Sequence, residues 1–210
     1  MLTPDQVEAL FTRADGSYVF ARWGRPIVPI VFGVDDATLS VLKGAIEAVV
    51  TLANHKMAET DPELGANLMV FFVQDWAELV ETSNIDQLIP DLAAVVERLQ
   101  AAKATQYRAF RFDEAGAIQA CFSFVRMDNA MAVLPAETIA LSLAVQAILL
   151  WSDVAFAEQS PLAVLPGEGA TILRPEIAGI IRAAFDPVMP LADRDPSHAL
   201  RLFARLGGTG

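Results

Sequence analysis

Three polar side chains occur at four-residue spacing within the longest nearly unbroken apolar run of the chain, Glu137 to Asp153. Thr138, Ser142 and Gln146 fall on one face if this run is helical. A polar stripe on an otherwise apolar helix has two interpretations. The side chains either hydrogen-bond to nearby backbone or water, or they line a cleft that takes a ligand.

The run itself predicts a central buried helix at residues 137–152. Its most apolar part, Ile139 to Trp151, is 13 residues long and is interrupted by Ser142 and Gln146. A membrane span needs about 20 apolar residues. A helix packed in the core is therefore the better interpretation, and we expect no membrane span.

Residue types that bind metals or act as nucleophiles are few and poorly spaced. His55 and His198 lie far apart in the sequence, and Cys121 is the single cysteine. Asp193, Asp195 and His198 either hold a cation or, as we prefer, mark a helix start with Asp195 as its N-cap. No serine has the flanking glycines of a nucleophile elbow. The sequence predicts no metal site, no cofactor and no catalytic residues.

Composition limits the class of partner. The chain has 210 residues, is 54% hydrophobic and has a formal net charge of −11. Its size and apolar content suit a single domain, which we expect to span residues 1–210. An acidic surface repels phosphate backbones and anionic lipids, so nucleic acid and membrane surfaces are disfavoured as partners.

The N-terminal residues predict a location. They contain neither a basic segment nor an apolar segment of the kind found in signal peptides. We expect a cytoplasmic protein. A periplasmic or exported protein is the alternative if the N-terminus was trimmed.

Local signals predict alternating helices and strands. We expect helices near residues 4–13, 37–57, 76–80, 90–99, 137–152, 175–185 and 196–206, and strands near 18–23, 27–32, 68–73, 107–112 and 117–126. Pro29 cannot donate to a strand ladder, which places its strand at a sheet edge or a bulge. A long loop is expected from Phe156 to Ile172. The pattern indicates the α+β class, with a small mixed sheet packed on long helices.

This order of elements resembles the zincin-like metallopeptidase fold, and in particular a bacterial group of uncharacterised domains with that fold. The active-site helix of that group reads Glu-Glu-x-x-Gln-x-x-Gly-x-x-Asn-Asp, where metzincins have HExxHxxGxxH. If Gln146 is set on the second histidine position, the remaining positions fall on Ser142 (first histidine), Leu143 (catalytic glutamate), Leu149 (glycine), Ser152 (third ligand) and Asp153 (following aspartate). The segment Ile172 to Pro187 also resembles the downstream helix of the group.

The resemblance implies a domain without zinc chemistry. A hydrolytic zinc site needs three strong ligands and a base for the bound water. Ser142, Gln146 and Ser152 are poor zinc ligands, and Leu143 cannot accept a proton. The resemblance therefore implies a non-catalytic domain that binds a peptide, a protein or a small molecule in the former substrate cleft.

The side chains expected to line that cleft are Ser142, Gln146, Ser152 and Asp153. Trp23 and Trp151 are large enough to anchor a ligand, although core packing is favoured for both. An edge strand beside the cleft would be able to pair with an extended segment.

Two other functions remain as alternatives. A hydrolase of another class would need two carboxylates converging on one pocket with shifted pKa values. A structural or oligomerisation module would have a filled cleft and a large apolar surface patch instead. The sequence leaves the ligand and the oligomeric state undetermined.

Overall fold

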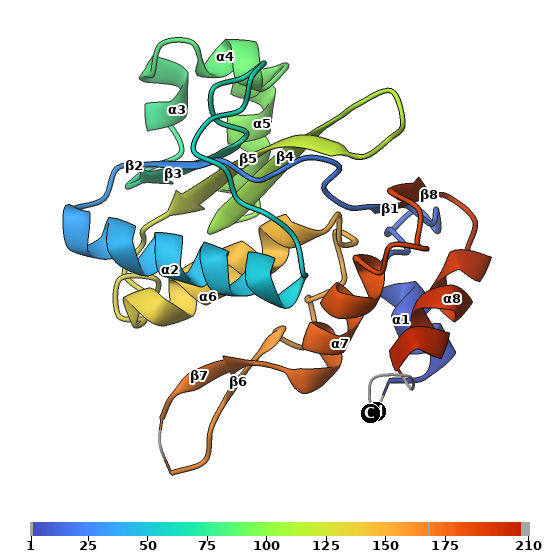
Figure 1. Cartoon of the computed structure of the whole chain (residues 1–210). Coiled ribbons are helices and arrows are strands. Elements are labelled where there is room, and N and C mark those ends of the chain that lie inside the picture. Colours follow the sequence, from blue (N-terminus) through green and yellow to red (C-terminus); the bar gives the residue numbers. More distant parts are fainter. Residues whose placement is uncertain (1, 168, 207–210) are drawn as a thin grey trace.

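A computed structural model of the chain (Figure 1) describes residues 2–167 and 169–206, and a four-stranded mixed sheet lies at its centre. The strands are β2 (Pro29–Phe32), β3 (Leu68–Val73), β4 (Gln106–Phe112) and β5 (Ile118–Arg126), in the order β2-β3-β5-β4. β2, β3 and β5 are parallel, and β4 pairs antiparallel with β5. Helices and a mixed sheet place the protein in the α+β class, as the sequence predicts.

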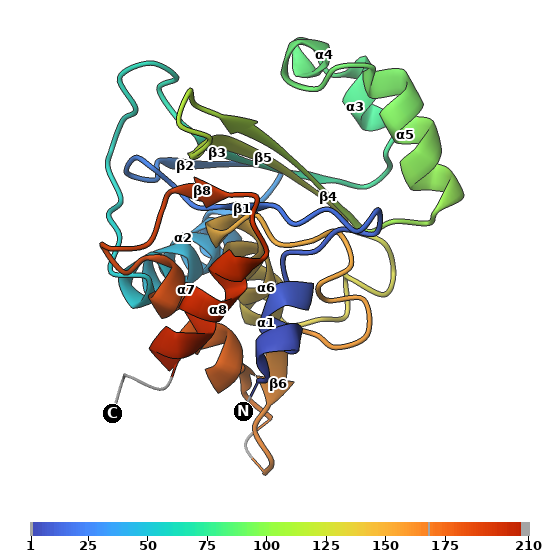
Figure 2. The ribbon, with the colours of Figure 1, turned by 90° about the vertical axis from the view of Figure 1, so that its right-hand side faces the viewer.

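Helices cover both faces of this sheet (Figures 1 and 2). α2 (Asp36–Leu52) and α6 (Ala136–Ile148) lie on one side, and α3 (Glu78–Glu81), α4 (Ile85–Leu88) and α5 (Leu92–Ala101) lie on the other. Alternation along β5 divides the core accordingly. Cys121 and Val125 belong to the larger core with α2 and α6, whereas Phe122 and Phe124 belong to the smaller core with α5. The period-two alternation of residues along this strand accounts for the division.

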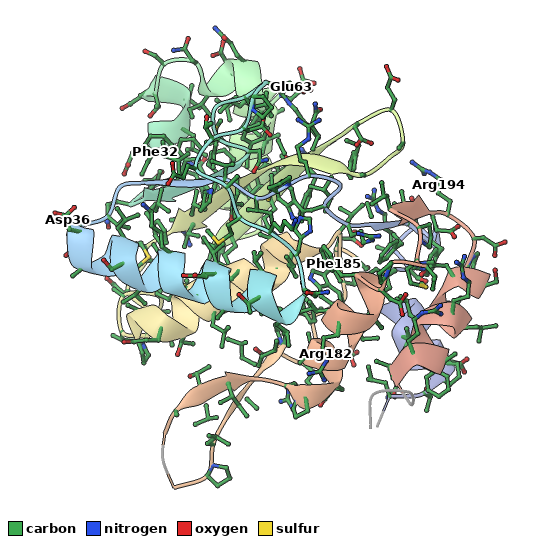
Figure 3. The ribbon with its side chains drawn as sticks, in the orientation of Figure 1. Phe32, Asp36, Glu63, Arg182, Phe185 and Arg194 are labelled. Carbon is green, nitrogen blue, oxygen red and sulfur yellow. The ribbon has the colours of Figure 1, made fainter. Side chains whose placement is uncertain are left out.

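A row of aromatic rings crosses all four strands on the α5 side. Phe32 stacks on Phe71 with 4.8 Å between ring centroids, and Phe71 stacks on Phe124 at 5.0 Å. Tyr107 of β4 lies 6.1 Å from Phe124. Phe32, labelled in Figure 3, ends the row at the β2 edge and is 43% exposed. Aromatic cross-strand pairs each contribute about 0.2–1 kcal/mol, so the row helps to hold the strands in register.

Elements from the two ends of the chain form a separate group. It comprises α1 (Pro4–Ala9), β1 (Phe20–Ala21), α7 (Pro175–Ala184), β8 (Ala192–Asp193) and α8 (Ser197–Leu206). α8 packs against α1 and α7, and β1 pairs antiparallel with β8. Phe185, labelled in Figure 3, joins this group to the chain beyond α2 through His55, 5.1 Å away between ring centroids.

Local sequence signals account for the position of several elements. Thr3 and Gln6 form a capping box at the start of α1. Asp35 caps α2 by accepting the backbone N–H of Thr38 over 2.7 Å. The strand containing Pro29 lies at an edge of the sheet, and Leu68–Val73 lies between two parallel neighbours.

The central helix is shorter than predicted, because α6 ends at Ile148 and not at residue 152. Leu149 is extended, with φ −136° and ψ 158°, and forms a bridge with Arg22. Two indole N–H groups satisfy carbonyls of the last turn: Trp23 donates to Ala147 over 2.9 Å and Trp151 donates to Val145 over 2.8 Å. These indole groups thus supply the hydrogen bonds that backbone N–H groups of a further helical turn would otherwise donate.

Other boundaries also need correction. α1 ends at Ala9 and not near residue 13, since Thr12 pairs with Tyr18. α2 ends at Leu52 rather than near residue 57. The segment 18–23 is not one strand, because its residues pair with several different partners. The expected loop 156–172 contains most of a hairpin, β6 (Leu162–Val164) and β7 (Thr171–Leu173), and β7 contacts α6.

Within the described ranges, every helix is too short or too polar to cross a membrane.

Candidate functional site

A hollow of about 450 Å³ lies between strand β4 and the chain that follows α6. Its volume is typical of sites for small ligands or side chains. The lining comes from three segments that are distant in sequence: Arg13; Gln106, Tyr107, Arg108, Phe110 and Phe112; and Leu150, Trp151, Ser152 and Asp153. We call this hollow the β4 cleft.

One wall of the β4 cleft is an unpaired sheet edge. Arg126 donates its backbone N–H to Thr105 over 2.8 Å, which identifies the bonded pairs between β5 and β4. In an antiparallel ladder such pairs alternate, so Tyr107 and Ala109 direct their N–H and C=O groups to β5. The backbone groups of Arg108 and Phe110 therefore point outward. In the described part of the chain, no backbone hydrogen bond joins these outward groups to another segment.

The opposite edge of the sheet is much less able to accept another strand. Val28 accepts the backbone N–H of Leu68 over 3.1 Å, so Pro29 and Val31 are the residues of β2 that face outward. Pro29 has no N–H to donate. Of the two edge strands of this sheet, β4 therefore has more outward-facing residues that offer both a backbone N–H and a backbone C=O group.

Arg108 is the principal charged group on the cleft wall. Its partner across the ladder is Ser123, and it therefore points to the same side of the sheet as α6. Its Nη1 donates to Oε1 of Gln106 over 3.3 Å. No carboxylate among the described residues lies within ion-pair distance of it. Burial lowers the pKa of its guanidinium.

Ser142 and Gln146 support the cleft from behind. Nε2 of Gln146 donates to Oγ of Ser142 over 2.8 Å and to Oε1 of Gln106 over 3.1 Å. Gln106 thus links Arg108 on β4 to the polar stripe on α6. Thr138, the third stripe residue, hydrogen-bonds instead to Thr171 of β7 at 2.8 Å. The stripe is packed against partners and is absent from the cleft lining.

Ser152 and Asp153 line the cleft, but their polar atoms hold the N-terminal segment. Oγ of Ser152 donates to the carbonyl of Thr12 over 2.7 Å, and Oδ1 of Asp153 accepts the N–H of Ala14 over 3.1 Å. These bonds place Arg13 in the lining. The four predicted residues therefore divide into two pairs, one bracing β4 and one anchoring residues 12–14.

Sequence reasoning missed the β4 residues that dominate the site. It predicted strands near 107–112 and 117–126, close to the observed bounds of β4 and β5, yet it assigned no role to Gln106, Arg108 or Phe110. The available signal was that one face of the first arm carries two polar residues, one of them a cation, followed by two aromatic residues: Gln106, Arg108, Phe110 and Phe112. Trp23 is fully buried in the core, as favoured from the sequence, whereas Trp151 packs in the core and also lines the β4 cleft.

The other candidate chemistries have structural explanations. Asp195 accepts the N–H of Ser197 over 2.9 Å, so it acts as a turn or cap residue. No cluster of three or more metal-ligating side chains occurs within residues 2–167 and 169–206. Cys121 is fully buried, and burial raises the pKa of its thiol to about 12. That thiol is held in its unreactive neutral form.

Six aspartates of the described chain have clearly shifted pKa values. Every aspartate with a resolved shift has a lowered pKa, and these residues are Asp15, Asp35, Asp61, Asp128, Asp186 and Asp195. Hydrogen bonds from Thr38 lower the pKa of Asp35, for example. A general acid would need its pKa raised toward neutrality.

A larger hollow of about 700 Å³ lies among α3, α4 and α5. Its lining combines aliphatic residues with the carboxylates of Glu81, Asp86 and Asp91. It offers no strand edge and no basic group, so it is a weaker candidate than the smaller β4 cleft.

Comparisons of the chain with family models, with curated proteins and with solved structures found no match.

Proposed function

We propose that this protein is a non-catalytic binding module that takes up an extended peptide segment in the β4 cleft. The observation that carries the proposal is the outward-facing backbone of Arg108 and Phe110 on the wall of a preformed hollow. An extended peptide would add a strand to this edge through main-chain hydrogen bonds, and the cleft would receive its alternate side chains.

We also propose that the architecture is zincin-like. Three parallel strands, an antiparallel edge strand and a long helix ending beside that edge support this relationship. The short helices α3, α4 and α5 on the opposite face are an addition to that arrangement. In this proposal the β4 cleft corresponds to the former substrate cleft.

Metal analysis of the purified protein tests the non-catalytic part of the proposal. We expect no stoichiometric zinc, since Ser142 and Gln146 bond to each other and Ser152 bonds to Thr12. Neutral hydroxyls and amides are weak zinc ligands. Tightly bound zinc at one equivalent per chain, retained through dialysis against a chelator, would contradict this proposal.

Amide hydrogen exchange measured by NMR tests the strand edge. In the free protein, we expect slow exchange for Tyr107 and Ala109, whose N–H groups bond to β5, and fast exchange for Arg108 and Phe110. A peptide selected from a displayed library of short linear sequences should slow exchange at Arg108 and Phe110. Tyr107 and Ala109 serve as internal controls on the same strand.

Two results would refute peptide addition at this edge. One is the failure of the library to yield any binder. The other is a binder that leaves exchange at Arg108 and Phe110 unchanged and protects amides elsewhere.

A further inference from the structure

We propose that the peptide carries a carboxylate that pairs with Arg108, two residues from an apolar side chain that contacts Phe110. This inference rests on the proposed function and adds the chemical class of its ligand. It follows from the lack of a carboxylate partner for Arg108 among the described residues and from the register of Arg108 on β4.

Arg108 differs from the other half-buried arginines of the described chain. The others pair with carboxylates or bond to two backbone carbonyls: Arg25 with Asp61 and Glu63, Arg126 with Asp128, Arg174 with Glu176, Arg205 with Asp186, and Arg22 with the carbonyls of Met189 and Pro190. Arg108 has a single long bond to a neutral amide. A half-buried cation of this kind gains a strong, charge-assisted partner when a carboxylate arrives.

The surroundings favour an anion from outside the protein. The chain has a net charge of −11, yet two of its 15 basic residues, Arg13 and Arg108, line this one hollow. The one carboxylate in the lining, Asp153, already accepts the N–H of Ala14. The neighbouring Cys121 is a neutral thiol and supplies no negative charge.

Strand register sets the position of the carboxylate in the ligand. Side chains of a strand added to β4 would alternate between the two faces of the sheet, as those of β4 do. Arg108 and Phe110 share the α6 side, and Phe112, which stacks with Phe110 at 6.5 Å, is 42% exposed. An acidic side chain opposite Arg108 therefore places the residue two positions away opposite an aromatic ring. A peptide C-terminal carboxylate would satisfy the same guanidinium.

Selection from the displayed library tests the inference. Wild-type protein should enrich Asp or Glu at one position and an apolar residue two positions away. Replacing that acid by its amide in the synthetic peptide should weaken binding roughly ten- to hundredfold, the range for hydrogen bonds to charged groups. Arg108→Gln should remove the difference between acid and amide peptides, and Arg108→Lys should retain part of it.

Arg111→Gln is the matched control. Arg111 lies on the same strand, is exposed and donates to the carbonyl of Gln87 on the other side of the sheet. This variant should keep the full preference for the acidic peptide. Comparing peptides with free and amidated C-termini then identifies the source of the carboxylate, because only a terminal carboxylate is lost on amidation.

Selected peptides without an acidic preference would overturn this inference and leave the proposed function standing. The inference would also be overturned, with the proposed function left standing, if Arg108→Gln kept the preference for acidic peptides and promoted self-association. Arg108 would then serve to prevent pairing of the β4 edge with other chains. The absence of any selected peptide would overturn both proposals.

Discussion

Replacing Asn67 by alanine is expected to lower the free energy of unfolding by about 3–5 kcal/mol. Asn67 is fully buried at the start of β3. Its Oδ1 accepts the N–H of Val28 over 2.8 Å, and its Nδ2 donates to the carbonyl of Pro26 over 2.9 Å and to Asp61 over 3.0 Å. The substitution leaves the N–H of Val28 and the carbonyl of Pro26 without these hydrogen bonds, and it removes a donor from the buried carboxylate of Asp61.

The expected change in the free energy of unfolding follows from the number of buried polar groups that Asn67→Ala leaves without a hydrogen-bond partner. Each buried polar group that loses its hydrogen bond costs about 1–3 kcal/mol. Asp61 is 4% exposed; burial raises its pKa, but hydrogen bonds from Leu64, Glu63, Asn67 and Arg25 outweigh this effect and lower it overall. Loss of the hydrogen bond from Asn67 therefore destabilises the buried, ionised carboxylate of Asp61.

Urea unfolding monitored by fluorescence and by circular dichroism measures this change. Gln119→Ala is the matched control, because the Gln119 amide donates to the exposed carboxylate of Glu63 (labelled in Figure 3). Its effect should stay within about 0.5 kcal/mol. If Asn67→Ala lowered the free energy of unfolding by less than about 1 kcal/mol, the hydrogen bonds around Asn67 and Asp61 would not stabilise the fold as proposed.

Acidification is expected to destabilise the protein by roughly 3 kcal/mol through His198 alone, from pH 6.5 down to about pH 4. His198 is 1% exposed, its Nδ1 lies 2.8 Å from the hydroxyl of Tyr18, and its ring lies 4.2 Å from that of Phe20. Its Nε2 has no hydrogen-bond partner within the described residues. Burial lowers the pKa of His198 to about 4; Asp193 opposes this effect, and Arg201 and Arg205 reinforce it.

The direction follows from proton binding in the two states. Well above pH 6.5 the imidazole is neutral whether the chain is folded or unfolded. Between pH 6.5 and about 4 the unfolded chain binds a proton that the folded chain excludes, so stability falls as the pH falls. His55 acts in the same direction, because burial also lowers its pKa.

Unfolding free energies measured across this pH range test the assignment. In the double variant Tyr18→Phe, His198→Phe the fall should be shallower, because the titrating group is gone and no unpaired hydroxyl remains. Tyr18→Phe alone keeps His198 and should keep most of the slope. An equal slope in the double variant and the wild type would show that other groups cause the acid sensitivity.

The amino-acid sequence by itself determined the local elements. The capping box of Thr3 and Gln6, the cap of Asp35 and the turn between β4 and β5 are contacts between near neighbours. Period-two alternation likewise determines which residues of β5 share a face. These signals depend on residues a few positions apart, so they can be interpreted without knowledge of the rest of the chain.

Only the tertiary structure decided where α6 ends and which strand borders the cleft. α6 ends at Ile148 because Leu149 bridges to Arg22 and the indole of Trp23 takes a carbonyl of its last turn, contacts that join residues more than a hundred positions apart. The role of β4 as the accessible edge depends on the strand order β2-β3-β5-β4. No local pattern encodes that order. The sequence placed Ser142 and Gln146 close to the site, and they do lie behind it. Arg108 belongs to the site only because long-range contacts place β4 beside α6.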